Sequence, residues 1–195
     1  MSSGMKTRAV SFLPLLVLLS LSREAGAASQ NDIDTAAINK RSSDAYINAR
    51  RTPDISILMA HQSLSASRSS GYRKGIADAS LALGMAYLAK YNQGDSAHYY
   101  NKLALETYAE TGDIAGQARA CYGLSYVFSF KGDLDSSEQY SNMALEYFEK
   151  AGDYRGVVNS LNVLAYLARQ IQDLESAKGY IERAIKTAGD RKSVV

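Results

Sequence analysis

The chain has 195 residues, with 22 Lys and Arg against 20 Asp and Glu, one cysteine and no tryptophan. This balanced charge, without runs of one sign, argues against a surface that binds nucleic acid or anionic membranes. A single cysteine excludes an internal disulfide, so packing must stabilise the fold. The length fits one domain or a short repeat array.

The N-terminal segment has the pattern of a secretory signal. Lys6 and Arg8 precede an apolar run from Val10 to Leu21, and the small residues Ala25, Gly26, Ala27 and Ala28 follow. The run is shorter than the roughly 20 residues that span a bilayer. We expect residues 1–28 to be a signal peptide cleaved near Ala27 or Ala28, and the mature chain to be periplasmic or secreted. The alternative is a cytosolic protein with an apolar N-terminal helix.

Residues 29–70 are expected to form one degenerate helical hairpin. Ile33, Ala37, Tyr46 and Ile47 mark its first helix. Its second helix follows Pro53, a residue that suits the first turn of a helix.

Three repeats follow, at about 75–112, 113–152 and 153–190, within residues 71–190. Three sets of small residues keep one register. The sets are Gly71, Gly112 and Gly152; Gly75, Gly116 and Gly156; and Ala104, Ala144 and Ala184. Such self-similarity is the signature of a repeat architecture. Residues 191–195 are expected to be a frayed tail.

Each repeat is expected to contain two amphipathic helices. Apolar residues recur at spacings of three and four, which places them on one helix face. These stripes are Ile114, Ala118, Cys121, Leu124 and Phe128 in the second repeat, Val157, Leu161, Leu164 and Ala168 in the third, and Leu174, Ala177, Ile181 and Ala184 in the last helix.

Gly-Asp pairs separate these helices, at residues 112–113, 132–133 and 152–153. Glycine takes the left-handed conformation that ends a helix, and aspartate accepts the free amide hydrogens that open the next one. Breaks this short predict antiparallel hairpins. Midway along the second helices, small residues allow close approach of a neighbouring helix; they are Ala97, Ser137, Ala177 and the three repeated alanines.

These units resemble tetratricopeptide repeats. The matching residues are Leu124, Ser125, Phe128, Gly132, Asp133, Leu134, Ser137 and Ala144 in the second repeat, and Leu164, Ala165, Asp173, Leu174, Ala177, Ile181 and Ala184 in the third. Gln172 replaces the expected turn glycine, Gly94 lies two places late, and the period is 40. This longer period resembles kinesin-light-chain-like and bacterial sensor-kinase arrays. A HEAT-type array has a similar period, but such repeats favour a proline in the first helix, which is missing here.

The resemblance implies an all-α fold, an α-α superhelix of about four helical hairpins, whose first helices line a groove for a protein or peptide. Mapping the family's groove positions gives partner-binding candidates. They are Tyr87, Arg119, Tyr122, Tyr126, Phe130, Asn159, Asn162, Tyr166 and Arg169. Each tyrosine has the alternative of packing between hairpins.

No residue pattern predicts catalysis, a metal site or a cofactor. His61 and His98 are isolated from other ligands, and Gly123-Leu124-Ser125 lacks the surroundings of a nucleophile elbow. Cys121, on an apolar stripe, is expected to be a buried small hydrophobe.

The sequence therefore favours an exported, non-catalytic scaffold that binds a protein or peptide. The alternative is the extracytoplasmic sensor region, truncated or not, of a bacterial histidine kinase or transcription regulator. The last repeat reaches the end of the chain without a polar capping helix, which repeat arrays usually need. We therefore also expect a homo-oligomer formed through this end, and no membrane span in the mature chain.

Overall fold

The computed structural model describes residues 35–90 and 93–190. The chain divides into two compact units, Met1–Ala37 and Ile38–Val195. The predicted signal peptide and the tail of residues 191–195 lie outside the described residues.

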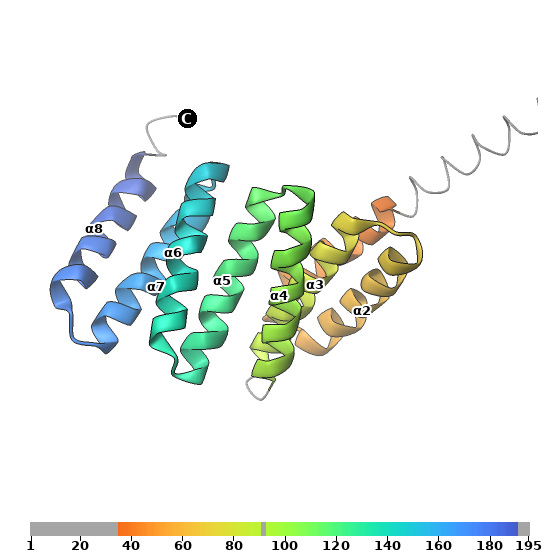
Figure 1. Ribbon diagram of the computed structural model, residues 1–195, viewed down its shortest axis with the longest axis horizontal. Helices are drawn as coiled ribbons and strands as arrows, with labels where there is room; N and C mark the ends of the chain where they lie inside the picture. The colour runs from red at the N-terminus through yellow and green to blue at the C-terminus, as the bar shows by residue number, and fades with distance from the viewer. Residues whose placement is uncertain (1–34, 91–92, 191–195) are drawn as a thin grey trace, which may run out of the picture. The chain divides into compact units, whose positions relative to one another are not determined.

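The second unit is all-helical wherever the structure describes it. Its first helix, residues 38–48 here, is followed by α2 (Pro53–Ser69), α3 (Arg73–Ala89), α4 (Gly94–Thr111), α5 (Ile114–Lys131), α6 (Leu134–Ala151), α7 (Tyr154–Gln170) and α8 (Leu174–Asp190). The helices lie side by side in chain order (Figure 1), and each packs against the next. This arrangement is an α-α superhelix, as predicted.

The helices form two layers with different contacts. α3 also packs against α5, and α5 against α7, whereas α4, α6 and α8 make no comparable contacts with one another within the described chain. The odd-numbered helices are therefore closer together than the even-numbered ones. A superhelix is curved when the helices of one layer are closer together than those of the other. The closer helices α3, α5 and α7 form its inner face.

The predicted helix breaks are confirmed. Gly112, Gly132 and Gly152 all have positive φ, between 68° and 76°. Asp113, Asp133 and Asp153 then accept hydrogen bonds of 2.8–3.0 Å from the amides of Gly116, Ser136 and Gly156. One otherwise unpaired amide at the start of each following helix is thereby satisfied. At the last break Gln172 takes the left-handed conformation, with φ 63°.

The repeated small residues mark close approaches between helices. Ala97, Ala104, Ser137, Ala144, Ala177 and Ala184 are all buried. Ser137 Oγ donates a 2.8 Å hydrogen bond to the carbonyl of Ser125, which fixes α6 tightly on α5. A Cβ added at Gly116 would lie 2.3 Å from the Tyr108 ring, and one at Gly156 would lie 2.1 Å from the Phe148 ring. These glycines therefore make room for an aromatic ring of the preceding helix.

Two predicted stripes are only partly buried. Ile114 is 42% exposed because it is the first residue of α5, while Ala118, Cys121 and Leu124 behind it are buried. In α8, Leu174 and Ile181 are 68% and 43% exposed. Among the described helices, α7 is the only one that packs closely against α8. The side chains of Leu174 and Ile181 are therefore not covered by a described helix. Self-association through this end stays a prediction.

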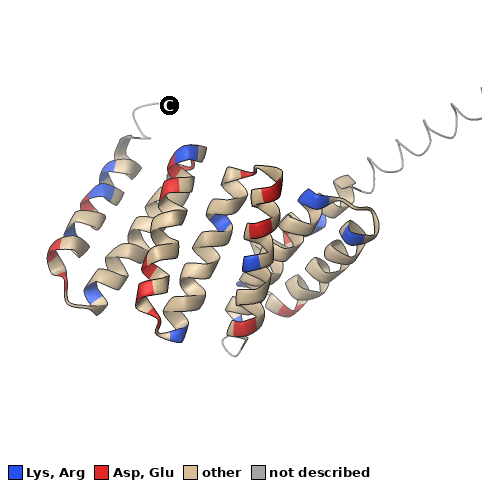
Figure 2. Ribbon diagram, viewed as in Figure 1, with Lys and Arg blue, Asp and Glu red and all other residues tan. Residues whose placement is uncertain are grey.

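Charged residues of both signs are mixed along the row of helices (Figure 2). Lys90 pairs with Asp54 at 2.5 Å, and Lys131 pairs with Asp95 at 2.7 Å. The two pairs are one repeat apart, and each joins successive hairpins. Exposed pairs of this kind contribute at most about 1 kcal/mol. Of the helices that the structure describes, none has the length and apolar content needed to cross a bilayer.

Candidate binding groove

The inner face carries two adjoining hollows that share Tyr126 and Phe130 of α5. One, of about 400 Å³, is completed by Arg50, Met85, Leu88 and Ala89. The other, of about 350 Å³, is completed by Ser129, Asn162, Val163 and Tyr166. Together they run from α3 across α5 to α7, and we name them the aromatic groove. Phe130 is 64% exposed and Tyr166 is 49% exposed.

Two contacts hold Tyr126 in place. The guanidinium of Arg50, in the turn after the first helix, lies over its ring, 6.0 Å from the centroid. Tyr122 donates a 3.1 Å hydrogen bond to its hydroxyl, and the two rings meet edge to face. Burial, together with this hydrogen bond, raises the pKa of the Tyr122 phenol, which keeps it protonated as a donor. The middle of the groove is therefore preorganised.

The structure brings Tyr126, Phe130, Asn162 and Tyr166 together in the groove. Tyr122 lies behind them, half-buried against the core and edge to face with Phe148. It therefore positions Tyr126 and offers little surface of its own.

Two other candidates lie elsewhere. Asn159 faces a separate hollow of about 280 Å³ with Thr187 and Ala188 of α8. Arg169 is exposed in the last turn of α7 and is not among the residues that line the groove. Both lie on α7 with Tyr166, but neither lines the aromatic groove.

Tyr87 was predicted to line the groove, and the structure places it on the other side of α3. Its ring stacks on Tyr100 of α4 at 5.5 Å, and its hydroxyl lies 3.1 Å from His61 Nε2 of α2. The physical reason is register. A step of 41 residues maps Tyr126 onto Met85, which does line the groove, whereas Tyr87 corresponds to Phe128.

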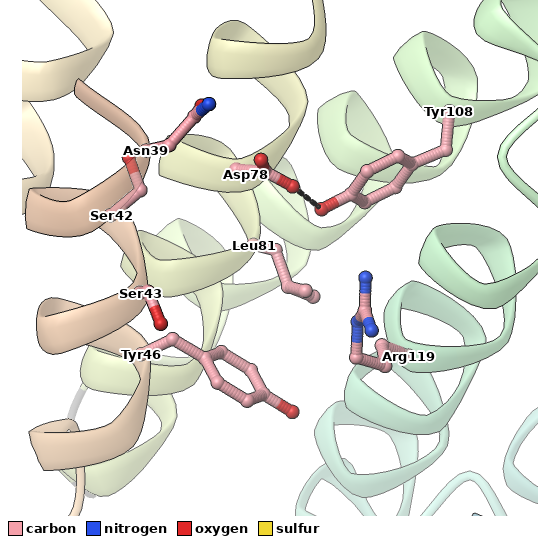
Figure 3. A pocket seen from close by; sticks show the side chains of 8 residues that line it. All are labelled: Asn39, Ser42, Ser43, Tyr46, Asp78, Leu81, Tyr108 and Arg119. Atoms are coloured by element: carbon pink, nitrogen blue, oxygen red, sulfur yellow. Dashed lines mark hydrogen bonds between the residues drawn. The ribbon is translucent and has the colours of Figure 1, made fainter. Parts of the chain in front are cut away.

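Arg119 faces a second site, a pocket of about 220 Å³ between three hairpins. Its lining residues are Asn39, Ser42, Ser43 and Tyr46 of the first helix, Asp78 and Leu81 of α3, Tyr108 of α4 and Arg119 of α5 (Figure 3). We name this the polar pocket. Tyr108 donates a 2.6 Å hydrogen bond to Asp78 Oδ1. Burial raises the pKa of the Tyr108 phenol, and the neighbouring Asp78 charge raises it further.

Several of these lining residues were not predicted from the sequence. Tyr46 and Arg50 are four residues apart, the spacing of one helix face, which was the available signal. Tyr108 had no such signal, because its approach to Arg119 depends on how the hairpins stack. Asp78 does share the repeat position of Arg119, one step of 41 residues earlier.

No family model matches the chain, and no curated protein sequence matches it. Function must therefore be argued from the groove and the pocket.

Neither a metal-binding cluster nor an accessible thiol is found in the described part of the chain. Within residues 35–90 and 93–190, no group of three His, Cys, Asp or Glu side chains could hold a metal ion. Cys121 is buried, as predicted, and burial raises the pKa of its thiol to about 12. A thiol with that pKa is unreactive at neutral pH.

Proposed function

We propose that this chain is an exported, non-catalytic scaffold of tetratricopeptide-like repeats that binds a protein segment or peptide in the aromatic groove. The observation that carries the proposal is the exposure of Phe130 and Tyr166 on one continuous concave surface with Tyr126. Aromatic side chains that stay exposed together in a hollow are typical of binding sites.

The composition of the groove supports a peptide ligand. Met85, Leu88, Phe130 and Val163 supply apolar contact area, and Tyr126 and Tyr166 add hydroxyls. Asn162 and Ser129 supply polar groups that pair with a peptide backbone. A hollow that crosses three parallel helices is elongated, which suits an extended chain better than a compact small molecule.

The signal pattern at the N-terminus supports export, and the buried small residues at the repeat positions support the tetratricopeptide-like assignment. Ala104, Ala144 and Ala184 are 0%, 0% and 5% exposed.

The test is selection of a displayed random-peptide library on the full chain, followed by binding of the enriched peptides to variants. The Tyr126→Ala/Phe130→Ala double variant is expected to weaken them by tenfold or more, about 1.4 kcal/mol. Fluorescence anisotropy gives the affinities, and circular dichroism checks that the variant stays folded.

The matched control is Ile55→Ala/Leu58→Ala, because both residues are exposed on α2, outside the groove. This variant should bind like the parent. The proposal would be overturned if the enriched peptides bound the groove variant as tightly as the parent. It would also be overturned if the α2 variant lost as much affinity as the groove variant.

A further inference from the structure

We propose that the polar pocket binds a carboxylate group, with Arg119 as its main partner. Arg119 is half-buried and belongs to no ion pair within the described chain. Its Nε is buried without a hydrogen-bond partner. Desolvating a guanidinium costs free energy, and a carboxylate bound to its accessible nitrogens would offset part of that cost.

The charge balance of the pocket favours an anion. Among the described residues that line it, Asp78 is the single carboxylate, and both of its oxygens are occupied. Tyr108 donates to Oδ1, and Lys74 lies 2.8 Å from Oδ2. Lys74 therefore offsets the charge of Asp78. Arg119 hydrogen-bonds Tyr108 and is attracted at longer range by Asp113, but it has no ion-pair partner of its own, so a ligand carboxylate can add one.

Other donors point to the same ligand. Ser42 lines the pocket, and its Oγ is buried without a hydrogen-bond partner. The Tyr46 hydroxyl projects toward the Arg119 side of the pocket (Figure 3), and burial raises the pKa of this phenol, so it remains a donor. One cation and two hydroxyls suit a single negative charge. A phosphate dianion would bring a second charge close to Asp78.

The volume of about 220 Å³ accommodates a group the size of a glutamate side chain. Two sources supply such a group. One is an acidic side chain of a peptide in the aromatic groove, since Tyr46 of the pocket and Arg50 of the groove are one helical turn apart. This source rests on the proposed function. The other is a free low-molecular-weight carboxylic acid.

The first experiment follows the Arg119 Nε–H resonance of the isotope-labelled full chain. It is titrated with N-acetyl-glutamate α-amide and with its neutral glutamine counterpart. The glutamate compound should shift the resonance saturably and the glutamine compound should not. Arg119→Gln should weaken binding about tenfold or more, and Arg119→Lys, which keeps the charge but not the planar fork, should weaken it less.

Arg68→Gln is the control, because Arg68 is exposed in the last turn of α2. Equal shifts with both compounds would overturn the proposal, as would unchanged binding to Arg119→Gln. If that variant does not fold, the comparison of the two compounds on the unmodified chain still decides.

A second arm separates the two sources. A peptide with one glutamate flanked by leucine and tyrosine is compared with glutarate, on the parent and on Phe130→Ala. A peptide source predicts tighter binding of the peptide, weakened by Phe130→Ala. A free acid predicts that glutarate binds at least as well, without effect of Phe130→Ala. Peptide binding that ignores Arg119→Gln would contradict this inference but not the proposed function.

Discussion

At the scale of single residues, the residues between helices determine where one helix ends and the next begins. Each of the four breaks that follow α4, α5, α6 and α7 pairs a left-handed residue with an aspartate cap. Three breaks use glycine for the first task, and the last uses Gln172 at φ 63°. A side chain in this conformation brings its Cβ against the carbonyl oxygen, at a cost of about 1–2 kcal/mol.

Gln172→Gly should therefore stabilise the chain. Part of the relieved strain is offset by the greater freedom of glycine in the unfolded state, so we expect a gain of about 0.5–1 kcal/mol. Urea unfolding measures it. Gln139→Gly, an exposed position inside α6, is the matched control and should destabilise by about 1 kcal/mol. A loss of stability in both variants would contradict the strain argument.

The aspartate caps give the fold a pH dependence. The pKa of Asp133 is lowered by its hydrogen bonds from Ser136. A carboxyl whose folded-state pKa is depressed contributes stability above its unfolded pKa, near 3.9, and loses it as the pH falls through the folded value.

Asp133→Asn keeps an acceptor at the cap but removes the titration. Its thermal unfolding temperature should fall less than that of the parent between about pH 5 and pH 3. Identical pH profiles for Asp133→Asn and the parent would show that the cap carries none of the acid sensitivity.

At the scale of helices, one aromatic pair recurs. Tyr87 stacks on Tyr100 at 5.5 Å, and one repeat later Phe128 stacks on Tyr140 at 5.4 Å, both nearly parallel. The next repeat keeps Tyr180 but has Ala168 in place of the first ring. A hollow of about 80 Å³ lies there, lined by both residues. The α7–α8 hairpin thus lacks a contact that the α3–α4 and α5–α6 hairpins have.

Ala168→Phe should restore it. The added ring enters a position where the fold already accepts one, and we expect a gain of about 1 kcal/mol from apolar burial. Ala165→Phe, buried one turn earlier without such a hollow, should lose about 1–3 kcal/mol by overpacking. Chemical denaturation of the pair measures the contrast. Similar losses in both would mean that the α7–α8 hairpin does not share the packing of the two hairpins before it.

The sequence predicted those features that depend on local chemistry. Helix periodicity, Gly-Asp breaks and buried small residues all follow from neighbours within one or two turns. Tyr87 was misplaced because the register was read two positions off. The α8 stripe was misjudged because burial of Leu174 and Ile181 depends on what packs over them. The polar pocket could not be predicted, since three stacked hairpins bring Tyr46, Asp78 and Arg119 together.

At the scale of the molecule, curvature follows from the closer packing of α3, α5 and α7. Each hairpin touches mainly its sequence neighbours, so stability is close to a sum of hairpin and interface contributions. In such an array, small changes of the angle at each interface between hairpins would add along the row. The aromatic groove, which crosses several interfaces, changes its width with that angle.

The polar pocket has walls from the first helix, from α3 and α4, and from α5, and so from three successive hairpins. The residues of this pocket therefore link three successive hairpins of the superhelix. A ligand bound there would contact all three hairpins, so it would favour the angles between hairpins at which those contacts are best. Because the aromatic groove crosses some of the same hairpins, a ligand in the polar pocket would also change the width of the groove and its affinity for a peptide.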